Sequence, residues 1–169
     1  MKVVADTSAL VSLGTVADRA RNPLDYLLDE HTVAAPKRVF DELEETANYE
    51  DSSGNGARRV LERREMFALC SVELDGTFPL DEGENAAITL ANDVEATQFL
   101  CDEFNQLALV HASLTTARLI TTPTLLVLLT RRSVFSGTDA ESVLVDISEA
   151  RSWSGNAYVE RARTTLSKQ

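Results

Sequence analysis

Two aspartates each follow a short apolar run that is typical of a β-strand. Asp6 comes directly after residues 3–5, and Asp102 comes directly after residues 97–101. Ligands of open parallel sheets bind outside the carboxyl ends of the strands, so both carboxylates could line one crevice. Each aspartate could instead cap a helix, and neither role is preferred for either residue alone. A threonine and a serine follow Asp6 and could cap that helix themselves, which slightly favours a functional Asp6.

Two glutamates on expected helices add further carboxylates. Glu42 lies just off the apolar stripe of the helix expected at 37–49, and Glu84 opens the helix expected at 83–92. Taken singly, Glu42 suits a solvated helix face, and Glu84 suits the positive end of a helix dipole. A cluster of three or four carboxylates, however, is costly unless a cation compensates it. All-oxygen ligation of this kind suits Mg²⁺ or Mn²⁺, which can acidify a bound water and hold a phosphate.

The elements that must position these residues alternate between strand and helix. Strands are expected at 3–5, 32–35, 67–72, 97–101 and 118–121, and helices at 9–13, 23–30, 37–49, 57–66, 83–92, 123–132, 138–150 and 155–166. Residues 50–56 are polar and rich in glycine and are expected to form a mobile loop, while 104–110 suit either a short helix or an irregular loop. The alternation predicts an α/β fold, a three-layer α/β/α domain with a mostly parallel central sheet.

Composition limits the class of protein. The 169 residues suit one domain, and no apolar run approaches the length of a membrane span, nor does a secretory signal open the chain. We therefore expect a cytoplasmic protein, in which Cys70 and Cys101 are buried free thiols, although a disulfide between them stays an alternative.

The charge is strongly negative. The chain has 27 acidic and 16 basic residues, a net charge of -11, and its only lysines are Lys2, Lys37 and Lys168. This surface suits a salt-adapted, for example archaeal, host, and the alternative is an ordinary acidic cytosolic protein. Strong salt screens repulsion to within a few Å, so the acidity is only weak evidence against a nucleic-acid substrate.

Four segments resemble the PIN domain, a family of small metal-dependent ribonucleases. They are VVADTSALVSL, VFDELEE, LDEGENAAITLA and FLCDE, in the order that the family has them. The first and third segments are the specific ones, and the similarity covers residues 1 to about 132. Residues 133–169 are then expected to be a helical C-terminal extension packed on the same domain.

The resemblance implies a metal site and a reaction. Its acidic residues would be Asp6, Glu42, Glu84 and Asp102, joined by Glu103, and they would hold Mg²⁺ or Mn²⁺ for attack of water on an RNA phosphodiester. Two hydroxyl residues, Thr7 and Ser8, would fix the pocket by hydrogen bonds.

The sequence departs from the family pattern in two places. Asn105 stands where many relatives have a further acid, and residues 121–124 (TTPT) replace the usual glycine–threonine segment. Because its side chain is neutral, Asn105 is assigned to substrate binding rather than to the metal. Arg58 and Arg59 are assigned to substrate binding as well, since arginine suits bidentate phosphate contact. The alternative for these arginines is a solvated face paired with Glu62 and Glu65.

Other residues fit structural roles better than catalytic ones. His31 and His111 have no metal-type spacing to any cysteine, and Trp153 and Tyr158 are expected to anchor the C-terminal extension by packing. No phosphate-binding glycine loop, zinc motif or serine-hydrolase motif occurs.

Three hypotheses follow for the function. The first is an Mg²⁺- or Mn²⁺-dependent endoribonuclease that acts on RNA, either as the toxin of a toxin–antitoxin pair, with an antitoxin partner and possible homodimer formation, or in RNA processing. The second is a PIN-like domain that binds RNA or protein without cutting. The third, a phosphoryl-transfer domain built on Asp6, is weaker because it would need a second acid near the first strand and a lysine after a late strand.

Overall fold

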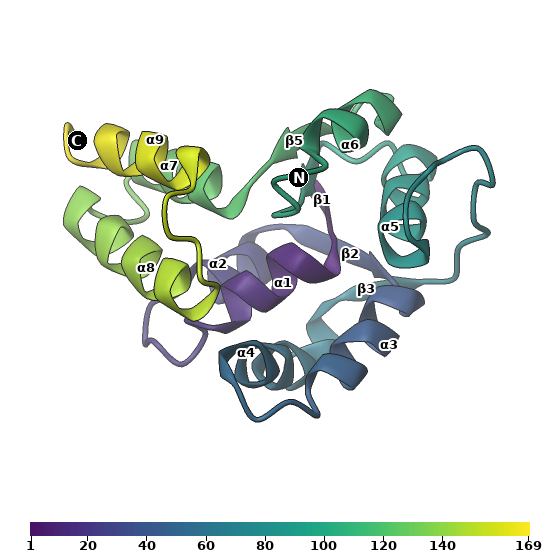
Figure 1. Ribbon diagram of the computed structural model, residues 1–169, viewed down its shortest axis with the longest axis horizontal. Coiled ribbons are helices and arrows are strands. Elements are labelled where there is room, and N and C mark those ends of the chain that lie inside the picture. Colours follow the sequence, from purple (N-terminus) through teal and green to yellow (C-terminus); the bar gives the residue numbers. More distant parts are fainter.

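A five-stranded, entirely parallel sheet forms the centre of the computed structural model, which describes residues 1–169 (Figure 1). The strands are β1 (Lys2–Ala5), β2 (Thr32–Pro36), β3 (Ala68–Cys70), β4 (Gln98–Leu100) and β5 (Arg118–Ile120). Their order across the sheet is β3-β2-β1-β4-β5. In this register Val4 of β1 pairs with Ala34 on one side and Phe99 on the other. The predicted parallel sheet is confirmed.

The strand order reverses its direction between β1 and β4. The chain starts at β1 in the middle, adds β2 and β3 on one side, and then returns to add β4 and β5 on the other. The connecting helices are α1 (Thr7–Gly14), α2 (Pro23–Glu30), α3 (Lys37–Thr46), α4 (Ser52–Leu61), α5 (Glu82–Asp93) and α6 (Leu107–Ser113). Right-handed crossovers put the helices of the two halves on opposite faces. Accordingly, α1 packs against α2 and α4, whereas α5 contacts β1, β2 and β4, and the three-layer fold is confirmed.

Three helices follow the sheet, α7 (Thr122–Arg131), α8 (Gly137–Ala150) and α9 (Ala157–Leu166). They pack against one another, and α7 and α8 also contact α1, so that they gather at one side of the molecule (Figure 1). Leu144, Ile147 and Leu166 of α8 and α9 belong to the same core cluster of 45 buried residues as the sheet. No helix has the length and apolar character to span a membrane.

The prediction of a loop at residues 50–56 is wrong, because α4 already begins at Ser52. Asp51 caps this helix by accepting a hydrogen bond from Gly54 N at 2.8 Å. The glycines that suggested a loop serve close helix packing instead. A Cβ on Gly14 of α1 would lie 2.2 Å from the carbonyl oxygen of Gly56, so the two backbones meet where neither residue carries a side chain. The packing offsets the low helix propensity of glycine.

Other boundaries differ by a few residues. α3 ends at Thr46 rather than at 49, α4 ends at Leu61 and is followed by a short 3₁₀ turn (Arg64–Met66), and β3 has only three residues. For residues 104–110 the sequence allowed either a short helix or an irregular loop. The structure has turns at 104–106, and α6 begins at Leu107.

Candidate metal centre

Asp6 lies at the carboxyl end of β1 and is almost fully buried, with 2% of its surface exposed. It caps α1, since its Oδ1 accepts from Ala9 N at 2.9 Å. Of the residues that could cap this helix, Asp6 does so rather than Thr7 or Ser8, because Asp6 has the extended backbone of a cap and α1 already begins at Thr7. A carboxylate has about four acceptor positions, so capping leaves room for a further ligand.

Ser8 joins Asp6 to Asp102 through one hydroxyl. Its Oγ donates to the Asp6 carboxylate at 2.8 Å and accepts from the backbone N of Asp102 at 2.9 Å. The two aspartates thus meet between β1 and β4, where the strand order reverses. This is the position at which doubly wound sheets bind their ligands.

Thr122 holds the other side of Asp102. The backbone N and the hydroxyl of Thr122 both donate to the carboxylate, at 2.7 Å each. The TTPT segment that replaces the family's usual sequence therefore orients an acidic side chain. Thr121 caps α7 next to it, which fixes the backbone of Thr122 at the helix start.

Glu42 and Glu84 approach the same edge from α3 and α5. Thr7 donates a hydrogen bond to the Glu42 carboxylate. Gly83 leaves room for this carboxylate, since a Cβ there would lie 2.0 Å from Glu42 Oε1. Asp81 caps α5 by accepting from Glu84 N at 2.8 Å and so adds a further carboxylate to the group.

The acidic side chains raise one another's pKa values. Burial raises the pKa of Asp6 to about 7, and the charge of Asp102 adds to the rise. Burial also raises the pKa of Glu84 to about 7, assisted by the charges of Asp81, Glu103 and Glu42. The pKa values of Glu42, Asp102 and Glu103 are likewise raised, in each case chiefly by burial. These mutual effects connect all the acidic residues into one electrostatic group.

The donor set fits a hard divalent cation in its chemistry. All the candidate ligands are carboxylate oxygens, and Glu84 Oε2 is buried without a hydrogen-bond partner. The geometry is less complete, because no three acidic, histidine or cysteine side chains are gathered tightly enough to hold an ion as they stand. Carboxylates without a compensating charge repel each other, so ligation requires their side chains to turn toward a common point.

The residues expected to bind substrate lie in different places. Asn105 is exposed in the turn after Asp102. Arg58 and Arg59 do not reach the carboxylates: Arg58 donates to the carbonyl of Tyr49 at 3.1 Å, beyond the end of α3, and Arg59 to that of Thr15 at 2.8 Å, beyond the end of α1. Their guanidinium groups hold α4 in place.

Three residues at this edge were not predicted from the sequence, namely Asp81, Thr122 and Arg151. Asp81 stands in the specific LDEGE segment, and its place just before Glu84 was a usable signal. Arg151 follows α8, and its positive charge lowers the pKa of both Asp102 and Glu103. Nothing in the sequence around Arg151 indicates this position.

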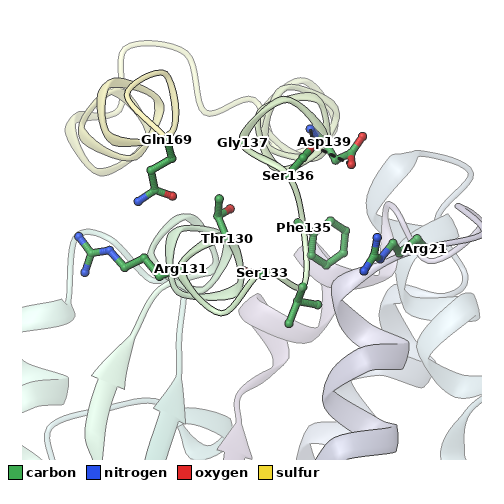
Figure 2. A pocket seen from close by; sticks show the side chains of 10 residues that line it. Arg21, Thr130, Arg131, Ser133, Phe135, Ser136, Gly137, Asp139 and Gln169 are labelled. Atoms are coloured by element: carbon green, nitrogen blue, oxygen red, sulfur yellow. Dashed lines mark hydrogen bonds between the residues drawn. The ribbon is translucent and has the colours of Figure 1, made fainter.

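The largest cavity, of about 630 Å³, lies elsewhere (Figure 2). Arg131, Phe135 and Gln169 line it around the end of α7, the helix whose first residue contacts Asp102. A smaller cavity of about 270 Å³ lies at the carboxyl edge of β2 and β3, where Lys37 and Arg38 line it. The acidic edge is a better candidate for the functional site than the largest cavity, because only that edge gathers groups with strongly shifted pKa values.

The fold and the site define a doubly wound α/β domain that carries an acidic cluster at its switch point. The family model that matches residues 2–168 is that of the PIN domain, and the chain belongs to this family. The match extends over the C-terminal helices. No curated protein matches the sequence. PIN domains have a nuclease-type fold and generally act as nucleases.

Proposed function

We propose that the protein is a metal-dependent endoribonuclease that hydrolyses RNA phosphodiester bonds. Asp6, Glu42, Glu84 and Asp102 would hold Mg²⁺ or Mn²⁺, with Glu103 beside them. The observation that carries this proposal is the buried, unpartnered oxygen of Glu84 within a group of carboxylates at the carboxyl edge of the sheet. Membership of a family of nucleases supports the same reading.

The chain's own groups would prepare the site in two ways. Ser8 and Thr122 fix the buried carboxylates through hydroxyl hydrogen bonds, which limits the reorganisation needed for ligation. Lys37, which lines the cavity at the same edge, would bind a phosphate that flanks the scissile one. A bound divalent cation would supply the acidification of water and the charge on the scissile phosphate.

The biological setting is a further part of the proposal. A toxin that is restrained by an antitoxin protein and an RNA-processing nuclease are the two settings that we propose. We also propose a cytoplasmic location, a homodimer, and a division into residues 1–132 and an extension at 133–169.

A second candidate is a domain that binds RNA or protein without cutting. It is favoured by the loose arrangement of the acidic side chains and by the neutral Asn105 in the exposed turn after Asp102. The two candidates make opposite predictions for cleavage and for metal binding.

The test measures both properties on the same protein. Purified wild type is incubated with single-stranded and structured RNA in high salt with Mn²⁺, and metal binding is followed by calorimetry. We expect wild type to bind Mn²⁺ and cut RNA, Asp6→Asn and Glu84→Gln to lose both, and the exposed capping variant Asp51→Asn to keep both. Wild type that neither cuts RNA nor binds Mn²⁺ would exclude the nuclease and leave the binding module.

A further inference from the structure

Three aromatic rings meet directly beside the acidic group. The Phe104 ring stacks on Tyr158, with centroids 5.3 Å apart and an interplanar angle of 24°, and packs edge-on against Trp153 at 5.0 Å. Phe104 follows Asp102 by two residues, and its backbone N donates to the carbonyl of Asp102 at 2.9 Å. The turn that carries Phe104 therefore directly follows one of the candidate ligands.

The C-terminal extension supplies two of these rings. Ser152, just after the end of α8, has a φ of 56°, and Trp153 N donates to the carbonyl of Ser148 at 2.9 Å, which turns the chain back toward Phe104. The short connection to α9, yellow in Figure 1, brings in Tyr158, and Asn156 fixes that end by accepting from Tyr158 N at 2.9 Å. The platform of Phe104, Trp153 and Tyr158 is thus held by backbone caps on both sides.

The outermost ring of the platform is open to solvent. Tyr158 is 41% exposed, although it stacks on Phe104 through one face, and it is one of only five large hydrophobic side chains that are this exposed. A half-exposed aromatic ring that is stacked on one face can accept a further flat group on the other. Packing of the extension alone does not require Tyr158 to remain exposed.

Arg151 adds a positive charge near the acidic group. It precedes Trp153 by two residues, donates to Ser53 Oγ at 2.9 Å, and has a buried Nε without any partner. Its charge acts on Asp102 and Glu103, which places the guanidinium close to the candidate ligands. An arginine with unused donors beside an acidic site is suited to a phosphate that lies over that site.

We propose that the C-terminal extension forms a nucleotide-binding wall of the site, in which the platform stacks a base of single-stranded RNA and Arg151 binds its phosphate. This inference rests on the proposed function, because it gives the substrate's position relative to the carboxylates. Stacking of bases on aromatic rings tolerates any sequence but requires an unpaired base. Single-stranded RNA should therefore bind more tightly than the same RNA in a duplex.

Trp153 is the only tryptophan in the chain, so its fluorescence reports directly on the platform. The metal-free full-length protein is titrated with a labelled single-stranded oligoribonucleotide, following both tryptophan fluorescence and anisotropy of the label. We expect quenching together with binding. Tyr158→Ala should weaken binding by roughly 5- to 150-fold, whereas Tyr158→Phe, which keeps the ring, should restore it. Arg151→Gln should reduce the salt dependence of binding by about one phosphate contact.

Two exposed residues provide matched controls. Tyr49→Ala, at a side chain that is 63% exposed, and Arg132→Gln, at the end of α7, should leave binding unchanged. Binding without quenching would contradict the proposal that the C-terminal extension binds a nucleotide. Equal affinity of wild type, Tyr158→Ala and Arg151→Gln would contradict it as well. If those variants also cut RNA with Mn²⁺ as wild type does, nucleotide binding by the extension is rejected and the proposed nuclease activity is retained. Quenching and weakened variants without any cleavage would support the wall and reject the nuclease.

Discussion

The aspartate that caps α1 should make the protein less stable at neutral pH than its asparagine variant. The pKa of Asp6 rises from 3.8 in an exposed aspartate to about 7 in the folded protein. The folded state therefore keeps a proton that the unfolded chain has lost, and stability falls as pH rises between these two values. A difference of roughly 3 pKa units corresponds to about 4 kcal/mol at pH 8. Asparagine removes this penalty but loses about 1 kcal/mol of hydrogen bonding to Ser8.

We therefore expect Asp6→Asn to raise the free energy of unfolding by roughly 2–3 kcal/mol at pH 8 and to leave it nearly unchanged at pH 4. Urea unfolding of both proteins, in constant salt with a chelator, at several pH values between these limits measures the difference. Asp51→Asn is the matched control, because Asp51 caps α4 in the same way but is exposed. A variant that is destabilised at pH 8, or a difference that does not change with pH, would refute the buried, protonated Asp6.

Three further outcomes test the fold and the site. Thr122→Val removes the hydrogen bond from the hydroxyl to Asp102, which should lower the free energy of unfolding by about 1.5–3 kcal/mol. The same variant should bind Mn²⁺ roughly 10- to 100-fold more weakly, and no change in either property would contradict the role of Thr122. Gly56→Ala puts a Cβ 2.6 Å from the carbonyl oxygen of Val11 and should cost about 1–3 kcal/mol, whereas Gly76→Ala, with open space, should cost nothing. Because the net charge is -11, raising KCl from about 0.1 M to about 1 M should increase the midpoint of thermal unfolding, and a fall would argue against a salt-adapted surface.

The sheet and its ends were predictable from local sequence. Runs such as residues 3–5 are short, apolar and β-branched, and a parallel strand that is buried on both faces needs little else. Asp6 and Asp102 follow two of these runs, so their meeting depended only on the strand order, which places β1 next to β4. The sequence predicted a mostly parallel sheet, but the strand order itself comes from the structure.

Contacts between distant segments were not predictable in the same way. The hydrogen bonds of Thr122 to Asp102 span 20 residues, and the bond of Ser8 to Asp102 spans 94. Residues 52–56 carry two glycines, so their local preference is for a loop. The helix is favoured by close packing against backbone outside these residues, since Gly54 lies against the carbonyl of Tyr49 and Gly56 against that of Val11 in α1. Such positions are decided by packing partners that a single segment does not contain.

The cost of the acidic group is itself an argument about its role. Asp6 and Glu84 are buried and would be more stable as neutral side chains, and their pKa values near 7 measure how poorly the fold alone compensates their charge. Hydrogen bonds from Ser8 and Thr122 offset part of this cost but leave Glu84 Oε2 without a partner. A ligand that binds only the folded state recovers such a cost by mass action. A divalent cation is the ligand whose chemistry best matches these carboxylates, and on the proposed function its binding would recover the free energy that burial of the acidic group costs.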